Sequence, residues 1–262
     1  MPGFEAFMAL GALMKLAFLG WLWSVYRRNA TIVDSLWSLF FLLALAVYFV
    51  TVPAAPEGEA RRALMLVIVT TWSLRLSAYL TWRNAGKPED RRYQAIRARN
   101  EPHYAFKSLY LVFGLQAVLA WIIAMPFHAV ATGDAPLNLV DIVGALLWLV
   151  GFVFQAVGDA QLAGFKRDPA NAGRVLERGL WRYTRHPNYF GEACMAWGYW
   201  LIAAATGGAW TVFAPLLMTF LLLRVSGVAL LEHDIGERRP DYAAYVRRTS
   251  AFFPRPPLKD EA

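Results

Sequence analysis

Six ionisable side chains lie inside long apolar runs, where a charge needs either a partner or a function. An ionisable residue within a membrane span costs at least ~2.5 kcal/mol on insertion scales, so each is a candidate functional group. Four of them fall at a similar distance along their runs and carry two charges of each sign, which predicts a polar cavity opening toward one face of a membrane. The alternative is two structural ion pairs that fix helix packing. The four residues are Asp34, Arg75, Glu192 and Arg224.

The other two intramembrane groups have simpler interpretations. Asp141 lies near the end of its run, and Lys15 is long enough to extend its amine toward the interface or to pair inside a helix bundle. We therefore expect these two residues to be structural.

The most informative segment runs from Gly179 to Glu192 and contains Arg185-His186-Pro187-Asn188-Tyr189. Pro187 is suited to the first turn of a helix, which would place the amides near Asn188 at a helix N-terminus that favours anions. With Arg182, Arg185 and His186 around it, this geometry outlines a phosphate site. An interfacial belt of Trp, Tyr and Arg residues explains the same pattern equally well.

Composition and the lengths of the apolar runs predict the helices that position these groups. The 262 residues are 58% hydrophobic and 17% charged, against about 25% charged in soluble domains, which argues against disorder and against a soluble fold. A span needs roughly 20 apolar residues. We expect an all-α bundle of seven transmembrane helices in one integrated domain, residues 1–262, with spans near residues 4–26, 32–52, 62–83, 108–127, 139–158, 189–206 and 210–231.

The distribution of basic residues predicts the orientation. Twenty Lys and Arg residues lie in the segments on one side of the expected spans, whereas the opposite loops hold only Arg61 and Arg62. By the positive-inside rule, the N-terminus is outside and the C-terminus is cytoplasmic. Topology accounts for the basic excess, so nucleic-acid binding has no remaining support. The single cysteine, Cys194, excludes a disulfide framework and a Cys-x-x-Cys metal or redox site, and no metal is expected.

The segment Arg185-His186-Pro187-Asn188-Tyr189-x-Gly191-Glu192 resembles the motif shared by membrane steroid 5-alpha-reductases, by sterol reductases acting at carbons 14 and 7, and by bacterial relatives of unknown function. It resembles more distantly the isoprenylcysteine carboxyl methyltransferases. Further similarity extends from about residue 30 to residue 254, in Gly158-Asp159-x-x-Leu162-x-x-x-Lys166, Arg75-x-x-x-Tyr79, Asn84-Ala85-Gly86-Lys87-Pro88, Glu232, Tyr242-x-x-Tyr245 and Phe252-Phe253-Pro254.

The resemblance implies an enzyme that uses NADPH to reduce the carbon–carbon double bond of a conjugated enone in a steroid or sterol-like membrane lipid. It implies a nucleotide site facing the cytoplasm, with no obligate protein partner, and short loops suggest a bacterial inner-membrane protein. The cofactor-binding residues implied are Arg75, Lys87, Asp159, Lys166, Tyr183, His186, Asn188, Tyr189, Glu192, Arg224 and Glu232.

Hydride addition to the beta carbon of an enone places negative charge on the carbonyl oxygen, so a proton donor aimed at that oxygen lowers the barrier. In the reductases a membrane Glu and a Tyr share this work. Asp34 falls where the family has its Glu, but Trp72 stands where the steroid enzymes have their Tyr. We therefore expect Asp34 and Tyr79 to be catalytic, with Trp37 and Trp72 contacting the substrate; an interface aromatic is an equally good interpretation of Tyr79.

Two other functions fit parts of the pattern. A methyltransferase of the isoprenylcysteine type would use S-adenosylmethionine, and Asp34, Arg75 and Lys166 are the features that favour a reductase over it. A transporter or sterol-binding module is a third alternative, but transporters tend to show inverted repeats and broken helices, and neither is visible in this sequence.

Overall fold

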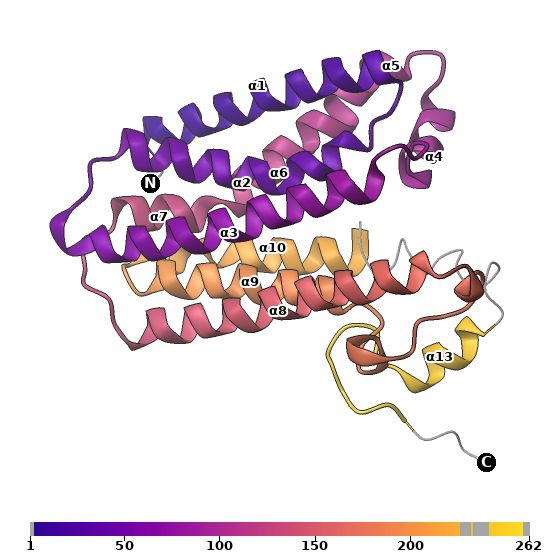
Figure 1. Cartoon of the computed structure of the whole chain (residues 1–262). Coiled ribbons are helices and arrows are strands. Elements are labelled where there is room, and N and C mark those ends of the chain that lie inside the picture. Colours follow the sequence, from indigo (N-terminus) through magenta and orange to yellow (C-terminus); the bar gives the residue numbers. More distant parts are fainter. Residues whose placement is uncertain (1–2, 226–231, 233–240, 259–262) are drawn as a thin grey trace. The chain divides into compact units, whose positions relative to one another are not determined.

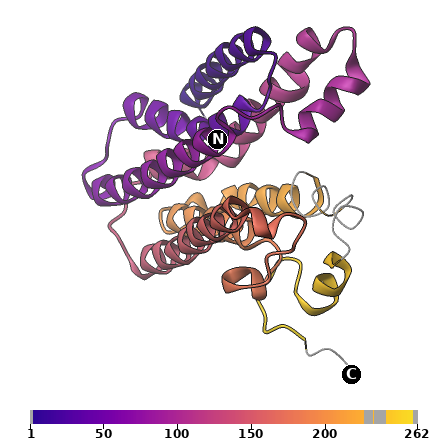
Figure 2. The same ribbon diagram turned by 45° about the vertical axis from the view of Figure 1, so that its right-hand side comes forward.

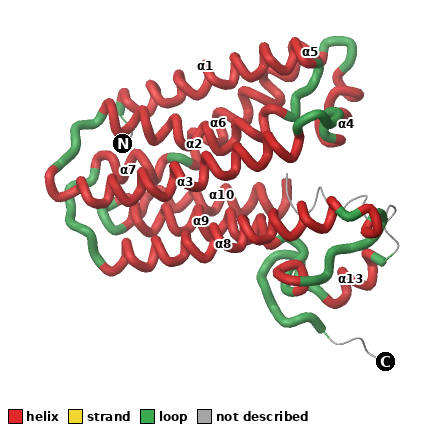
Figure 3. Tube along the Cα trace, in the orientation of Figure 1, coloured by secondary structure: helices red, strands yellow, loops and turns green. Residues whose placement is uncertain are grey.

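The structure is a computed structural model that describes residues 3–225, Glu232 and residues 241–258. Within these ranges the chain forms helices joined by turns and loops, with no β-strand (Figure 3). The all-α prediction is confirmed for this part of the chain.

Six helical stretches are long and apolar enough to cross a membrane, which supports an integral membrane protein. They are Phe4–Arg27, Ile32–Thr51, Pro56–Asn84, Tyr104–Thr132, Leu139–Arg167 and Gly208–Val225. The other expected span, near residues 189–206, corresponds to helix α9, Pro187–Ala204, which is not one of the six. Seven spans and their orientation stay predictions.

The Cα positions divide the chain into two compact units. The first comprises residues 1–138 and 202–211, and the second comprises residues 139–201 and 212–262. We describe each unit by itself.

The first unit is built on α1 (Phe4–Arg27), α2 (Ile32–Thr51) and α3 (Glu59–Asn84), which run side by side, with α2 against both neighbours (Figures 1 and 2). The buried stripe of α1 repeats every three or four residues at Ala6, Ala9, Leu13 and Ala17. This period places small side chains on one face of a helix, so α2 can approach closely.

The stretch Tyr104–Thr132 is helical but not uniform. It consists of α5 (Tyr104–Ser108), a π-helical segment η2 (Leu109–Gly114), α6 (Leu115–Ile123) and α7 (Met125–Thr132). Pro126 occupies the first turn of α7, where its missing N–H removes no helical hydrogen bond, and the helix restarts there. Two short elements lie between the longer helices of this unit: η1 (Pro56–Gly58) and α4 (Arg91–Asn100).

The structure corrects the placement of the two basic residues expected in the outer loops. Arg61 and Arg62 lie within α3 and are buried. Arg61 donates to the carbonyl oxygens of Ala135 and Pro136, and Arg62 donates to those of Phe49, Val52 and Ala131. A guanidinium group that bonds the free carbonyls at the ends of α2 and α7 also complements the negative ends of those helix dipoles.

The second unit contains α8 (Leu139–Arg167), most of α9 (Pro187–Ala204) and α10 (Phe213–Phe220), which run side by side (Figures 1 and 2). Short 3-10 segments η3 (Pro169–Asn171) and η4 (Gly179–Arg182) connect α8 to α9, and α13 (Tyr242–Arg248) lies near the C-terminus. Segment η5 (Gly208–Val212) precedes α10, and the π-helical η6 (Leu221–Val225) follows it.

One face of α8 exposes large apolar side chains along most of its length, among them Leu139, Ile142, Leu146, Leu149 and Val153. A soluble protein rarely exposes such a continuous apolar stripe, whereas a lipid-facing helix requires one. The face is therefore suited to membrane lipid.

Candidate functional site

Close packing of α8 on α9 brings together two motifs that lie about 30 residues apart in the sequence. A Cβ atom at Gly151 would collide with the backbone of Gly191, and one at Gly191 would collide with that of Gly151, so only glycine permits this approach. One helical repeat further along, the ideal Cβ position of Gly158 is 3.0 Å from Pro187. The Asp159 carboxylate and the start of α9 are neighbours as a result.

Asp159 contacts the motif directly. Asn188 Nδ2 lies 3.5 Å from Asp159 Oδ1, and the indole N–H of Trp181 donates to the carbonyl of Gly158 at 3.0 Å. Asp159 itself is buried. The role of Asp159 in holding this loop for a cofactor stays a prediction.

The centre of this part of the molecule is the Glu232 cluster, which we define as Glu232, Arg185, His186 and Tyr242. Arg185 donates to both carboxylate oxygens of Glu232 at 2.8 Å, and His186 Nε2 is 2.8 Å from Oε1. The Tyr242 hydroxyl donates to the same Oε1 at 3.1 Å. Three side chains therefore contact one carboxylate.

The cluster shifts the acidity of its members. Burial alone would raise the pKa of Glu232, but the hydrogen bonds and positive charges of His186 and Arg185 outweigh it and hold the pKa at about 2. Burial, followed by the negative charge of Glu232, raises the pKa of the Tyr242 phenol. At neutral pH Glu232 is thus a carboxylate and Tyr242 a neutral phenol.

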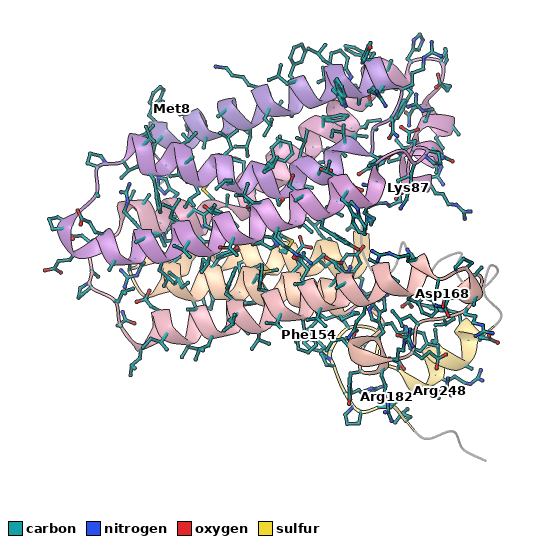
Figure 4. The ribbon with its side chains drawn as sticks, in the orientation of Figure 1. Met8, Lys87, Phe154, Asp168, Arg182 and Arg248 are labelled. Atoms are coloured by element: carbon teal, nitrogen blue, oxygen red, sulfur yellow. The ribbon has the colours of Figure 1, made fainter. Side chains whose placement is uncertain are left out.

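Arg185 also fastens the motif to the C-terminal segment. Its Nη1 donates to the carbonyl oxygens of Val246 and Thr249 at 3.2 and 2.6 Å, and its backbone N–H donates to that of Ser250 at 2.8 Å. Figure 4 labels Arg182 and Arg248, which belong to the two segments joined in this way. The guanidinium of Arg185 is therefore fully engaged by the protein, which does not suit it to an additional phosphate.

One hydrogen-bond acceptor at the start of α9 is unsatisfied within the described residues. Asn188 Oδ1 is buried and has no hydrogen-bond partner among the described residues. His186 and Tyr189 stack beside it with nearly parallel rings, 5.5 Å apart and inclined by 7°. This carbonyl oxygen can accept one further hydrogen bond, for example from an amide N–H₂ group.

Three other expected cofactor ligands in this unit, Lys166, Tyr183 and Arg224, are exposed. Exposed cations suit the phosphates of a nucleotide better than Arg185 does. Glu192 is buried, and Gln155 Nε2 lies 3.4 Å from its Oε2. No group of three or more His, Cys, Asp and Glu side chains with metal-binding geometry occurs in the described part of the chain.

The first unit holds a second carboxylate centre, the Asp34 cluster, which we define as Asp34, Asp90, Arg92 and Tyr93. Asp34 lies in the first turn of α2 and accepts from Arg92 Nη2 at 2.7 Å and from the Tyr93 hydroxyl at 2.6 Å. Arg92 Nε also donates to Asp90 at 2.9 Å. Because Asp34 accepts in both contacts, the transferable proton of the cluster lies on Tyr93.

The backbone around α4 explains why these groups meet. Asp90 caps α4 by accepting from the N–H of Arg92, and its own N–H donates to Thr31 Oγ1 at 2.8 Å. Glu89 accepts from the N–H of Ala30 and holds Arg97 through both of its oxygens. Residues 89 and 90 therefore fix α4 against the turn that precedes α2.

Tyr93 is 5% exposed and its environment keeps it protonated. Burial, followed by the negative charge of Asp34, raises the pKa of Tyr93 well above its usual value, although Arg92 acts in the opposite direction. Gln116 Nε2 is 3.4 Å from the phenol oxygen.

The other expected residues of the first unit are aromatic and cationic side chains with ring contacts or an exposed position. Arg75 and Arg83 flank the ring of Tyr79, with guanidinium carbons 5.4 and 5.9 Å from its centroid. Trp72 is buried, and it and Trp37 each pack edge-on against Phe41. Lys87 is exposed in the loop before α4 (Figure 4).

Sequence reasoning missed Arg92 and Tyr93 as partners of Asp34, and Gln155 and Tyr242 as neighbours of the motif carboxylates. The only signal for the first pair was that the segment 84–107 is long and rich in Arg and aromatic residues, a pattern typical of functional loops. Nothing in the local pattern distinguishes Tyr93 from Tyr104 or Tyr110.

Comparison with known proteins shows a family that covers most of the chain. A family model described as "Protein of unknown function (DUF1295)" matches residues 20–249. A Schizosaccharomyces pombe protein named as uncharacterized is 25% identical over 276 residues, covering 94% of this chain and 79% of that protein. No solved structure matches the chain.

Proposed function

The chain belongs to the DUF1295 family, and from this premise we propose that it is an NADPH-dependent membrane reductase of the steroid 5-alpha-reductase type. Its substrate is a conjugated enone in a steroid-like lipid, such as a 3-oxo-delta-4 steroid, and its product is the 5-alpha-dihydro compound. The resemblance of the Arg185-His186-Pro187-Asn188-Tyr189 segment to those reductases supports this assignment.

The observation that carries the proposal is the carboxylate–phenol pair at the end of a transmembrane helix. Tyr93 donates to Asp34 at 2.6 Å, and Arg92 holds the other carboxylate oxygen at 2.7 Å. To act as the donor, this neutral phenol turns its one O–H from Asp34 to the enone oxygen and gives up the proton as negative charge develops there. The geometry favours Tyr93 over Tyr79 as the donor, with Asp34 orienting it.

The second unit supplies residues that suit the cofactor. Asn188 Oδ1 would accept from the nicotinamide amide group, while Lys166, Tyr183 and Arg224 would contact the phosphates or ribose. Bound NADPH would supply the hydride. His186 and Tyr189 offer flat surfaces, and Glu232 holds His186 in place.

The proton and hydride steps balance on the substrate. The beta carbon gains the hydride and the double bond becomes an enolate, whose oxygen takes the proton of Tyr93. The enol then returns to the ketone, and Tyr93 regains a proton from water. Arg92, next to Asp34, offsets the negative charge left on the Tyr93–Asp34 pair during this exchange.

The decisive experiment is conversion of progesterone with NADPH by membranes that contain the wild-type protein, Asp34→Asn or Tyr79→Phe. We expect a 5-alpha-reduced product from the wild type, nearly none from folded Asp34→Asn, and nearly wild-type conversion by Tyr79→Phe. If no enone is reduced but a methyl group passes from S-adenosylmethionine to a lipid carboxylate, the protein is a methyltransferase of the isoprenylcysteine type.

The proposed topology adds α9 to the six candidate spans as the sixth of seven in chain order, with the N-terminus outside and the C-terminus in the cytoplasm of a bacterial inner membrane. It rests on the excess of Lys and Arg on one side of the spans. A reporter that functions only in the cytoplasm should be active when fused to the C-terminus. Activity of a periplasm-specific reporter at that position would contradict the orientation.

A further inference from the structure

Lys15 occupies a position that the sequence interpretation did not anticipate. We expected its amine to extend to the interface or to pair inside the bundle, but Lys15 is exposed on the outer face of α1. Its neighbours on that face are exposed apolar side chains, including Met14, Phe18 and Leu19. No ion pair of Lys15 occurs among the described residues.

Because α1 is long, the Lys15 amine cannot reach the membrane surface from either end of the helix. The helix has 24 residues and a rise of about 1.5 Å per residue, so Lys15 lies about 17 Å from either end. The hydrocarbon core of a bilayer is about 30 Å thick. A lysine stem of about 6 Å cannot bridge that distance, so the amine of Lys15 stays in hydrocarbon unless another molecule supplies an acceptor.

The surface around Lys15 has the form of a helix-packing site. A groove of about 470 Å³ is lined by Gly11, Met14, Lys15, Phe18 and Leu19, spaced as one face of a helix. A Cβ atom added at Gly11 would meet nothing within 4 Å, so another backbone can approach closely there. Met8, labelled in Figure 4, extends the same face toward the start of α1 and is 43% exposed.

A second copy of this chain does not supply the missing acceptor. The acidic side chains in its described spans are engaged, buried or at a span end: Asp34 binds Arg92, and Asp141 and Asp159 are buried. Glu5 binds His128, and the exposed Glu57 and Glu59 lie at the very start of the span Pro56–Asn84, whereas Lys15 lies at the middle of its own span. A symmetric dimer through this face would instead bring two Lys15 amines toward each other.

We propose that the groove along Gly11, Lys15 and Leu19 docks a transmembrane helix of a different protein, and that this helix carries an Asp or Glu near its centre. The carboxylate satisfies the Lys15 amine, and the open surface at Gly11 lets the two backbones pack closely. The proposal concerns a partner surface in the first unit and does not depend on the reductase assignment.

A model peptide tests the chemistry of the groove. The full-length protein is reconstituted in phosphatidylcholine vesicles with a 21-residue Leu/Ala transmembrane peptide that has one central Asp. A photo-reactive amino acid replaces Leu19, and cross-linking is measured against peptide concentration. We expect the Asp peptide to bind about tenfold more tightly than the same peptide with a central Leu.

Matched variants separate charge from shape. Lys15→Met should abolish the preference for the Asp peptide, Lys15→Arg should keep it, and Lys15→Glu should transfer it to a peptide with a central Lys. The same photo-reactive residue placed at Leu146, an exposed apolar position of α8, should show no preference.

Three results would overturn the proposal. Equal binding of the Asp and Leu peptides, or a preference that survives Lys15→Met, would show that charge does not govern the groove. Cross-links from position 19 between two copies of the protein would assign the face to self-association. Cross-links to lipid alone, with every peptide, would make the groove a lipid-facing surface.

Discussion

The Asp34 cluster and the Glu232 cluster use the same three kinds of side chain, a carboxylate, an arginine and a tyrosine, but connect them differently. Arg92 and Tyr93 are consecutive residues of one short helix, so both of these partners of Asp34 come from a single element, 58 and 59 residues along the chain. The partners of Glu232 come from the turn before α9 and from α13, more than 50 residues apart along the chain.

The difference indicates what each cluster does. Arg185 donates to Glu232 and to two backbone carbonyls, so its first effect is to hold the C-terminal segment against the motif. Tyr93 donates only to a side-chain carboxylate and belongs to a helix fixed by Glu89 and Asp90 instead. The sequence motif with the stronger family resemblance thus makes contacts that hold the C-terminal segment, and the less distinctive segment contains Tyr93, the proton donor of our proposal.

Replacing the two phenols should give the largest contrast between the clusters. Tyr93→Phe removes the proposed proton donor without changing volume, so we expect enone reduction to fall by roughly 10²- to 10³-fold. Tyr242→Phe should leave the rate of the folded protein close to wild type. Initial rates with NADPH, normalised to folded protein in detergent, measure the activity of both variants. Equal losses of activity in the two variants would show that the two clusters do not differ in function.

Replacing the carboxylate of the second cluster should mainly affect stability. Glu232→Gln leaves the buried Arg185 without its ionic partner, which costs about 3 kcal/mol when a buried pair is broken. Glu177→Gln, which removes a more exposed pair with Arg248, is the control and should cost less than about 1 kcal/mol. Denaturant unfolding in detergent measures the loss in free energy of unfolding for each variant. Similar losses would contradict the structural role of Glu232.

The pH dependence of stability should also distinguish Glu232. Its pKa is about 2 in the folded protein against an ordinary value of 4.5, because His186 and Arg185 stabilise the carboxylate. The resulting stabilisation, up to about 3 kcal/mol, is present above pH 4.5 and is lost as the pH falls toward 2. The gap in stability between wild type and Glu232→Gln should therefore narrow over that range, and a constant gap would show that Glu232 does not titrate in this way.

The smallest effect should come from the arginine of the first cluster. Arg92→Lys cannot reach Asp34 and Asp90 together, so one charge-assisted hydrogen bond is lost, at a cost of about 1 kcal/mol. Arg185→Lys loses more contacts and should destabilise the protein further. If the order of the two variants is reversed in thermal unfolding, the Asp34 cluster is the more important structural connection.

The apolar runs were enough to place the main helices. The expected spans near residues 4–26, 32–52, 62–83 and 189–206 coincide with helices within a few residues, because a run of roughly 20 apolar residues in lipid must satisfy its backbone within a helix. The helix at residues 139–158 extends to Arg167, the span 108–127 falls in the non-uniform stretch Tyr104–Thr132, and residues 226–231 of the last expected span lie outside the described residues. The proline at position 187 likewise predicted the start of α9. These features depend on local sequence, so they could be predicted without the tertiary structure.

The partners of the charged residues could not be predicted in the same way. Asp34 bonds residues 58 and 59 positions away, Arg185 bonds a residue 47 positions away, and Arg61 and Arg62 bond carbonyls of other helices. Helical periodicity shows which residues share a face but not which helix lies opposite. The sequence by itself determined the membrane helices and the motif; only the tertiary structure decided that Tyr93 meets Asp34 and that Lys15 faces outward, because both depend on how the helices pack around one another.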